Sequence, residues 1–347
     1  MKNWIQNLNK KQWIWFGIAL VSLMGFAILM LVSHSLKTSL SDQRAAQRWS
    51  NDDSFAQISC FFADTELIGI NEIMSFRNQI EKSLGEAAYA SNEGKGRSYI
   101  DAYSSYGTVN IISGQGSLDT KAVGIGGDFF LFHPLTLVNG AYFSGHDLMK
   151  DSVILDEEAA WHLFGSFDII GMPVLIGDVP HYVRGVIKRE RGRLWEAAGL
   201  NSGVAYLSEE SLSAYGRTSG VHHYEAVMPN PVSGFAYRVA AEKFGYTEDK
   251  MMVLDNTARY DLEALIQIIA EAGLRSMQSY AIRFPYWENY ARGMEDIIAF
   301  ILVFQVVFLL MPILIIMVMI IILYRQKRWT WLDVFANFYK WIASKRT

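Results

Sequence analysis

Two uncharged apolar segments, Trp13–Ser33 and Ile297–Tyr324, stand at opposite ends of this 347-residue chain, with a long polar stretch between them. Neither segment contains Asp, Glu, Lys, Arg or His. Each is long enough for a helix that rises about 1.5 Å per residue to cross a hydrocarbon core about 30 Å thick. The pattern predicts two transmembrane helices, residues 13–33 and 296–324, with one large domain between them.

The first segment has a second interpretation, a cleaved secretory signal, because Lys2, Lys10 and Lys11 precede it like a charged n-region. However, it exceeds the usual signal core of about 7 to 15 residues, and residues 32–35 lack a clear cleavage motif. For the second segment the alternative is a buried core helix, but its unbroken apolarity leaves no polar face for water. We therefore expect an uncleaved membrane anchor at each end.

The charges beside the two segments predict the orientation, because Lys and Arg are retained on the cytoplasmic side. Residues 1–12 have three basic residues and no acidic one, and residues 325–347 have six basic residues against the single acid Asp333. We expect a plasma (inner) membrane protein with both termini in the cytoplasm and residues about 34–295 outside. Since the whole chain has a net charge of −4, the outer domain is acidic. This negative charge argues against nucleic acid as a partner of the outer domain. Membrane lipid is the first partner that we expect.

The outer part is expected to fold, because 51% of the whole chain is hydrophobic. Short apolar segments alternate with amphipathic ones, which predicts an α+β extracytoplasmic domain between the two transmembrane helices. We place two subdomains in it, residues 34–190 and 191–295, with the boundary at the charged segment Arg189–Arg193. Strands are predicted at 55–62, 98–103, 109–112, 121–125, 152–155, 173–176, 181–187, 204–207, 223–228, 251–254 and 276–283. Helices are predicted at 65–87, 159–164, 234–244 and 260–272, with a short one that opens at 208.

Residues 151–187 give the clearest local signals. Asp156 can cap a helix that ends at Gly165, a residue suited to a left-handed C-terminal position. Gly177-Asp178 predicts a hairpin between two strands. The acidic residues Asp156, Glu157 and Glu158 are explained by the positive end of that helix rather than by catalysis.

Few residues of the chain match a known catalytic or binding motif. The glycine-containing segments 94–96, 114–116 and 124–127 match neither a P-loop nor a full dinucleotide-binding fingerprint. Among the seven histidines only His222 and His223 are adjacent, and neighbours on a strand point to opposite faces, so we interpret them as surface residues. Cys60 is the single cysteine and lies in a strand-like segment, which favours a buried inert thiol. We therefore expect no enzyme, and no catalytic, cofactor-binding or metal-ligating residue.

Several short motifs follow one another along the chain in a characteristic order. They are Gly126-Gly-Asp-Phe-Phe-Leu-Phe-His-Pro-Leu135, Asn139-Gly-Ala-Tyr-Phe143, Val153–Gly165, Ile170-Gly171 and Tyr182–Val186. In this order the chain resembles the periplasmic core domain of MacB-type ABC transporter permeases, the wider family that includes FtsX. The resemblance extends over about Ser35–Ser208. The motif glycines and aromatics look structural, so the match reports fold more directly than activity.

The resemblance implies a non-catalytic membrane subunit that couples a separate cytosolic ABC ATPase to motion of the outer domain, in a transporter or a mechanotransmission complex. ATP is then expected on the partner chain. Other permease copies or a paralogous permease are further expected partners, as is a membrane-fusion protein or another extracytoplasmic adaptor. MacB-type permeases have four transmembrane helices, so we expect a reduced form with two. The alternative is a membrane-anchored extracytoplasmic binding or scaffold module without an ATPase.

Three sequence features are expected to lie in or near the membrane. In the cytoplasmic tail, residues 325–347, Trp331, Phe335, Phe338 and Trp341 recur at helical spacing. An amphipathic helix there either anchors at the inner interface or docks a partner. The aromatic segment 284–292 is expected at the outer interface, and Pro312 is expected to kink the second span.

Overall fold

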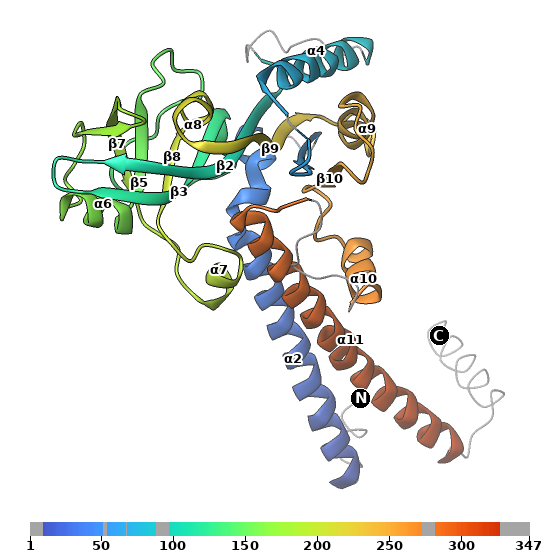
Figure 1. Cartoon of the computed structure of the whole chain (residues 1–347). Coiled ribbons are helices and arrows are strands. Elements are labelled where there is room, and N and C mark those ends of the chain that lie inside the picture. Colours follow the sequence, from blue (N-terminus) through green and yellow to red (C-terminus); the bar gives the residue numbers. More distant parts are fainter. Residues whose placement is uncertain (1–9, 51–53, 67, 88–96, 273–281, 327–347) are drawn as a thin grey trace, which may run out of the picture. The chain divides into compact units, whose positions relative to one another are not determined.

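The structure is a computed structural model that describes residues 10–50, 54–66, 68–87, 97–272 and 282–326. It forms two compact units: one joins Met1–Ser35 with Phe300–Thr347, and the other is Leu36–Ala299. Its helices are α2 Lys10–Ser39, η1 Ser41–Arg44 (a 3₁₀ helix), α3 Ala45–Trp49, α4 Ile70–Glu86, α5 Phe129–Phe132, α6 Glu157–Phe164, α7 Arg193–Ala197, α8 Glu209–Tyr215, α9 Phe235–Lys243, α10 Leu262–Ala270 and α11 Tyr286–Gln326 (Figure 1). Its strands are β1 Phe55–Phe62, β2 Ile100–Ile112, β3 Ser117–Gly127, β4 Leu137–Gly140, β5 Ser152–Asp156, β6 Pro173–Ile176, β7 Val179–Ile187, β8 Val204–Ser208, β9 Arg217–Pro229 and β10 Met251–Asp255.

The first unit is built from the apolar parts of α2 and α11. Helical segments long and apolar enough to cross a membrane lie at Trp13–Ser39 and Tyr286–Ile322, and only 11% of the apolar 18-residue window within each is buried, unlike a soluble core helix. The expected architecture, an α+β domain flanked by two apolar helices, is therefore confirmed.

Polar side chains join the two apolar helices to each other. The Ser22 hydroxyl donates to the Phe308 carbonyl at 2.7 Å, and the Gln305 amide donates to the Leu29 carbonyl at 3.0 Å. Such interhelical bonds, together with small residues at the contact, stabilise helix pairs in lipid. Pro312 lies inside α11, and its expected kink remains a prediction.

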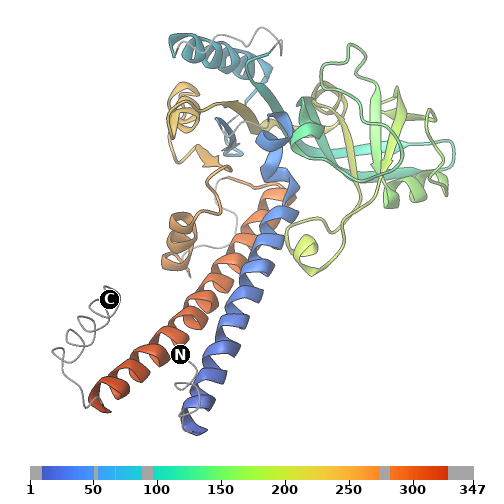
Figure 2. The ribbon, with the colours of Figure 1, turned by 180° about the vertical axis from the view of Figure 1, so that it is seen from behind.

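The second unit is organised around one ten-stranded sheet. Its strand order is β10-β1-β9-β2-β3-β8-β5-β7-β4, and β6 pairs with β2 and β7. Most neighbours are antiparallel, but β3 with β8 and β5 with β7 are parallel. Because β9 is paired with β1 on one side and β2 on the other, its backbone groups lie in the sheet interior. Figures 1 and 2 show the sheet from opposite sides.

Helices cover different ends of this sheet. At the β10–β1 end α9 packs on β1 and α4 packs on α9, whereas toward the other end α6 packs on β3, β5 and β7, and α8 packs on β2 and β3 (Figure 1). Two of the largest buried side chains at the first end are Phe76 and Tyr224, whose rings meet edge to face. At the second end the buried core includes Leu155, Leu163 and Val183. A third buried cluster surrounds Trp287 and is described below.

The sheet runs across the subdomain boundary expected at residues 189–193. Strand β9 lies between β1 and β2, and β8 lies between β3 and β5, so strands after the boundary pair with strands before it. Residues 34–190 and 191–295 therefore do not form two separate sheets, and Leu36–Ala299 is one compact unit.

Local signals located several elements accurately. The Asp156 carboxylate accepts from the Ala159 amide at 2.8 Å and caps α6, and Gly165 ends that helix in the left-handed conformation at φ 65°. In the hairpin between β6 and β7, Gly177 and Asp178 both have positive φ, 56° and 63°. A tight turn with this backbone matches the right-handed twist of the two strands.

Other elements differ from expectation. Most of segment 98–103 and all of 109–112 belong to one strand, β2, because residues 104–108 between them bulge and still pair with β9. Helix α4 begins at Ile70 rather than 65. The tail at 1–12, the loop at 90–97, the strand expected at 276–283 and the tail at 325–347 fall wholly or mostly outside the described residues.

Candidate functional site

The first turns of α11 belong to the outer domain and carry buried charges. Glu288 and Glu295 are only 2% and 5% exposed, and Arg292 contacts Glu288 at 3.0 Å between Nε and Oε1. Their spacing places all three on one helical face, so this face meets the domain rather than solvent. Buried carboxylates need partners, because an unpaired charge in the interior is costly.

Arg259, which follows β10, is the partner of both carboxylates. Its Nη1 and Nη2 each donate to Glu288 at 2.7 Å, a bidentate pair, and its Nε donates to Glu295. Burial opposes the charge of Arg259, but Glu288 outweighs that effect and the pKa of the guanidinium is raised. The arrangement fastens α11 to the segment after β10 through a fully desolvated ion cluster.

The cluster continues into the sheet as a chain of buried hydrogen bonds. Arg259 donates to Asn256 Oδ1 at 3.0 Å, and Asn256 Nδ2 donates to the Ser59 hydroxyl at 2.7 Å. Ser59 in turn donates to Glu225 Oε1 at 2.6 Å, and Glu225 Oε2 lies 2.6 Å from His133 Nε2. We call this continuous series, from Glu288 to His133, the buried relay.

The segment that follows α2, which comprises η1 and α3, is also fastened to β1. Gln57 on β1 accepts from the Ala45 amide at 2.8 Å and donates to the Asp42 carbonyl at 2.6 Å, so its side chain holds both η1 and α3. Arg48 on α3 donates to the carbonyls of Leu131 and Phe132 at 2.9 and 3.0 Å. The segment that follows α2 and the first turns of α11 therefore both connect to β1 through polar side-chain contacts.

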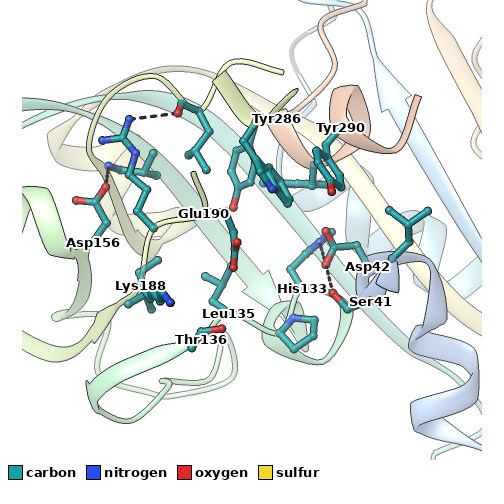
Figure 3. A pocket seen from close by; sticks show the side chains of 18 of the residues that line it. Ser41, Asp42, His133, Leu135, Thr136, Asp156, Lys188, Glu190, Tyr286 and Tyr290 are labelled. Carbon is teal, nitrogen blue, oxygen red and sulfur yellow. Dashed lines mark hydrogen bonds and ion pairs between the residues drawn. The ribbon is translucent and has the colours of Figure 1, made fainter. Parts of the chain in front are cut away.

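A cavity of about 240 Å³ lies between these attachments. Ser41 and Asp42 come from η1, Tyr286 and Tyr290 from α11, and Lys188 from the segment after β7 (Figure 3). Acidic, basic and aromatic groups thus face one space, as in sites that bind small polar molecules.

Aromatic side chains of α11 form one wall of the cavity. Tyr286 shares a hydrogen bond of 2.6 Å with Tyr206 on β8, and Tyr290 stacks on Trp195 with ring centroids 3.6 Å apart. Trp287 is 3% exposed and belongs to the domain core. The segment 284–292, expected at the outer membrane interface, is therefore in large part core.

The far end of the relay is a compact group of His133, His223 and Glu225. One ligand-type atom from each lies within 4.8 Å of the others, and all three side chains are buried. Burial favours neutral imidazoles, and it lowers the pKa of His223 to about 4. For His133 the charge of Glu225 outweighs burial and raises the pKa to about 9, while the same pairing lowers the pKa of Glu225 to about 2.

The interpretation of His222 and His223 as surface residues is wrong. They are 7% and 2% exposed, because β9 lies inside the sheet and not at its edge. The expectation that they point to opposite faces is consistent with their contacts, since His222 bonds Ser219 while His223 contacts Glu225. The missed signal is His223-Tyr-Glu225, because residues two apart on a strand share a face.

Other residues singled out in the sequence have structural roles. Cys60 is buried, and burial raises the pKa of its thiol well above the usual range. Asp156 caps α6 and also accepts from the Val204 amide at 3.1 Å. Gly126 lies against the ring of Tyr103, so the 124–127 segment provides close packing and not a phosphate cradle.

The chain is similar in sequence to a known domain family and to several known proteins. The profile of the MacB-like periplasmic core domain matches residues 14–241. The macrolide export ATP-binding/permease protein MacB of Chromobacterium violaceum is 28% identical over 131 residues, which is 37% of this chain and 19% of that protein. MacB 2 of Aeromonas hydrophila, described in the same words, is 33% identical over 86 residues, 24% of this chain and 13% of that protein. The matches thus span less than a fifth of these relatives.

Among solved structures, the periplasmic region of MacB from Actinobacillus actinomycetemcomitans is 17% identical, with a TM-score of 0.39 over 62% of this chain and 92% of that one. The extracellular domain of the ABC-type transporter YknZ from Gram-positive bacteria is 16% identical, with a TM-score of 0.36 over 57% of this chain and 99% of that one.

Proposed function

We propose, since this chain belongs to the MacB-like ABC transporter permease family, that it is a non-catalytic subunit coupling a separate cytosolic ATPase to motion of its outer domain. Two apolar helices flank a MacB-like periplasmic domain, so the chain is a membrane protein with an extracytoplasmic domain. In the proposal both termini lie in the cytoplasm, where the ATPase binds ATP. Further permease copies or a paralogue, and an extracytoplasmic adaptor, complete the complex.

The buried relay is the observation that carries the proposal. A coupling subunit requires that a shift of a membrane helix reach the outer domain without being absorbed by a linker. Here α11 runs without interruption from Tyr286 to Gln326, and its first turns are held by Arg259 through paired, desolvated charges. Since breaking one partner of such a cluster is costly, a displaced helix takes its attached strands with it.

The attachment of α2 supports the same mechanism. Gln57 holds the segment after α2 on β1, and Ser59, two residues later on the same strand, belongs to the relay. Residues two apart on a strand share a face, so both helices act on one face of β1. Relative motion of the helices would then strain a single strand in the interior of the sheet.

The first experiment is purification of the chain from native membranes in mild detergent. The proposal expects an ATP-hydrolysing chain to co-purify in a fixed ratio. Its reproducible absence, with the two helices intact, would contradict the proposal.

A second experiment tests coupling directly. Leu148 is 97% exposed and can be replaced by cysteine for labelling with an environment-sensitive dye, because Cys60 is buried. In the reconstituted complex, ATP should change the dye emission. Arg259→Met should reduce that change, whereas Arg283→Ala, at an exposed ion pair with Asp64, should leave it intact. If ATP changes the dye emission equally in the labelled protein without a further substitution, in Arg259→Met and in Arg283→Ala, the buried relay is excluded as the coupling element.

The cavity favours a second candidate function, a membrane-anchored binding or scaffold module without an ATPase. Its volume of about 240 Å³ and mixed polar and aromatic lining suit a small ligand. This alternative expects no ATPase on purification, and a ligand whose binding is lost when Tyr286→Ala opens the aromatic wall.

A further inference from the structure

The group at the end of the relay has the composition of a metal site. His133, His223 and Glu225 are 2%, 2% and 3% exposed, and they present two imidazole nitrogens and a carboxylate. Two histidines and one glutamate form a known zinc ligand set that leaves a fourth position open. Imidazole ligands also suit other first-row divalent cations.

One atom of the group lacks a partner. His223 Nε2 is buried without a hydrogen bond and lies 3.6 Å from Glu225 Oε1. Buried polar atoms are nearly always hydrogen-bonded, so an unbonded nitrogen beside a carboxylate points to a ligand between them. His133 Nδ1 is likewise buried without a hydrogen bond, at 3.7 Å from Asp42 Oδ1.

The packing around the group fixes its side chains. The ring of Phe61 stacks on His223 with centroids 4.6 Å apart and an interplanar angle of 12°. The ring of Trp287 lies 4.4 Å from that of His133. Rings held in this way lose little further freedom when they bind a ligand, which is the condition for a preorganised site.

Polar groups also stand behind the ligand atoms, as they do in metal sites. Ser59 donates to Glu225 Oε1 at 2.6 Å, and the Ser104 hydroxyl lies 3.4 Å from His223 Nδ1, the nitrogen remote from the group. Asp42 occupies the corresponding place behind His133. Such outer contacts set the tautomer and orientation of a ligating histidine.

We propose that His133, His223 and Glu225 form a binding site for a first-row divalent cation of the Zn²⁺ class. Tetrahedral bonds of about 2.0 to 2.2 Å place ligand atoms about 3.3 to 3.6 Å apart. The His223–Glu225 separation of 3.6 Å is close to this, whereas the 2.6 Å hydrogen bond between His133 and Glu225 has to open. His133 also lines the cavity, which gives the cation a route to the site.

The site would link the sheet to the segment after α5. His223 and Glu225 are on β9, whereas His133 directly follows α5. A bound cation would replace one hydrogen bond by three coordinate bonds across these elements. The site therefore goes beyond the coupling function, which does not require a metal.

The test uses the full chain in detergent, stripped with EDTA and then titrated with Zn²⁺. We expect one Zn²⁺ per chain by elemental analysis after desalting, and a rise in the unfolding temperature. With Co²⁺ as probe, the wild-type protein should show the visible absorption of a tetrahedral nitrogen–oxygen site, a readout that needs no variant.

Variants locate the binding. His223→Ala and Glu225→Gln should each abolish stoichiometric binding, and Ser59→Ala should weaken it roughly 10- to 100-fold, as loss of an outer contact does. His146→Ala removes a half-exposed histidine and His222→Gln changes the neighbour with contacts on the other face, so both should bind as the wild type does. Unfolding curves recorded without metal show which variants are folded.

Two results would overturn the proposal. One is the absence of stoichiometric Zn²⁺ and of a tetrahedral Co²⁺ spectrum in the wild-type protein. The other is binding that persists in folded His223→Ala or Glu225→Gln, which would assign the metal to surface residues.

Discussion

Replacing Arg259 by methionine removes the guanidinium that both Glu288 and Glu295 contact. Arg259 makes two hydrogen bonds to Glu288, one to Glu295 and one to Asn256, and all four residues are buried. Removal of one partner of a buried ion pair costs about 3 to 5 kcal/mol, because the remaining charge is left without compensation. Two carboxylates lose Arg259 here, but Glu288 keeps its contact with Arg292 at 3.0 Å, so we expect a loss within that range.

The expected loss is large enough to measure in the unfolding of the outer domain. For a domain of this size, 1 kcal/mol corresponds to about 2 to 4 °C in melting temperature, so Arg259→Met should lower it by roughly 10 °C or more. Near-ultraviolet circular dichroism of the full chain in detergent follows this transition through the buried tryptophans and tyrosines. Arg259→Lys should also destabilise, because an ammonium group cannot bridge Glu288 in bidentate fashion.

Arg283→Ala is the matched control. Its ion pair with Asp64 has a separation of 2.9 Å, but the arginine side chain is 75% exposed, so its loss should cost about 0 to 1 kcal/mol. Combining Arg259→Met with leucine at both glutamates should recover part of the stability, since apolar replacement of a buried ion cluster is often near neutral, although Arg292 then loses Glu288. If Arg259→Met lowers the melting temperature no more than Arg283→Ala does, the buried ion cluster does not stabilise the domain and the prediction is wrong.

Three further predictions concern the outer domain. Asp156→Ala should cost about 1 to 2 kcal/mol in chemical unfolding through loss of the α6 cap. Asp156→Asn should cost less, because its single carbonyl oxygen can still cap α6, although its amide nitrogen cannot accept from Val204. Gly126→Ala would place Cβ 2.0 Å from the ring of Tyr103 and should cost about 1 to 3 kcal/mol, whereas Gly114→Ala, with open space around it, should be close to neutral in the same measurement. Cys60 should react with a thiol reagent only as fast as the domain opens, because burial keeps the thiol protonated and inaccessible; rapid labelling of folded protein would contradict this.

The structural features predicted best from the sequence are those that depend on interactions between residues close together in the chain. The cap at Asp156, the helix end at Gly165 and the turn at Gly177 and Asp178 each depend on residues a few positions apart. Strand β1 was located at its observed bounds because six of its eight residues are apolar. The α+β fold class was predicted from the order in which the expected strands and helices alternate along the chain.

The pairing of the strands could not be predicted in the same way. Strand β1 lies between β9 and β10, far away in the chain, and no local pattern states which strands become neighbours. This also explains the error at His222 and His223, since a histidine on a central strand is buried, whereas the same residue at an edge need not be.

The candidate site shows the same limit. Arg259 and Glu288 are 29 residues apart and look like ordinary surface charges in the sequence. Only the fold shows that both are buried and face each other. The alternation of His223 and Glu225 on one strand was readable in advance, but their third partner, His133, lies 92 residues from Glu225.

The position of β1 has a consequence for how the chain is made. During synthesis β1 emerges early, yet its two neighbours are residues 217–229 and 251–255, so both of its edges stay open while most of the domain is translated. Long-range pairing of this kind slows folding and leaves an apolar strand available to wrong partners. Polar Gln57 and Ser59, which interrupt that apolar segment, thus also reduce its tendency to aggregate before β9 arrives.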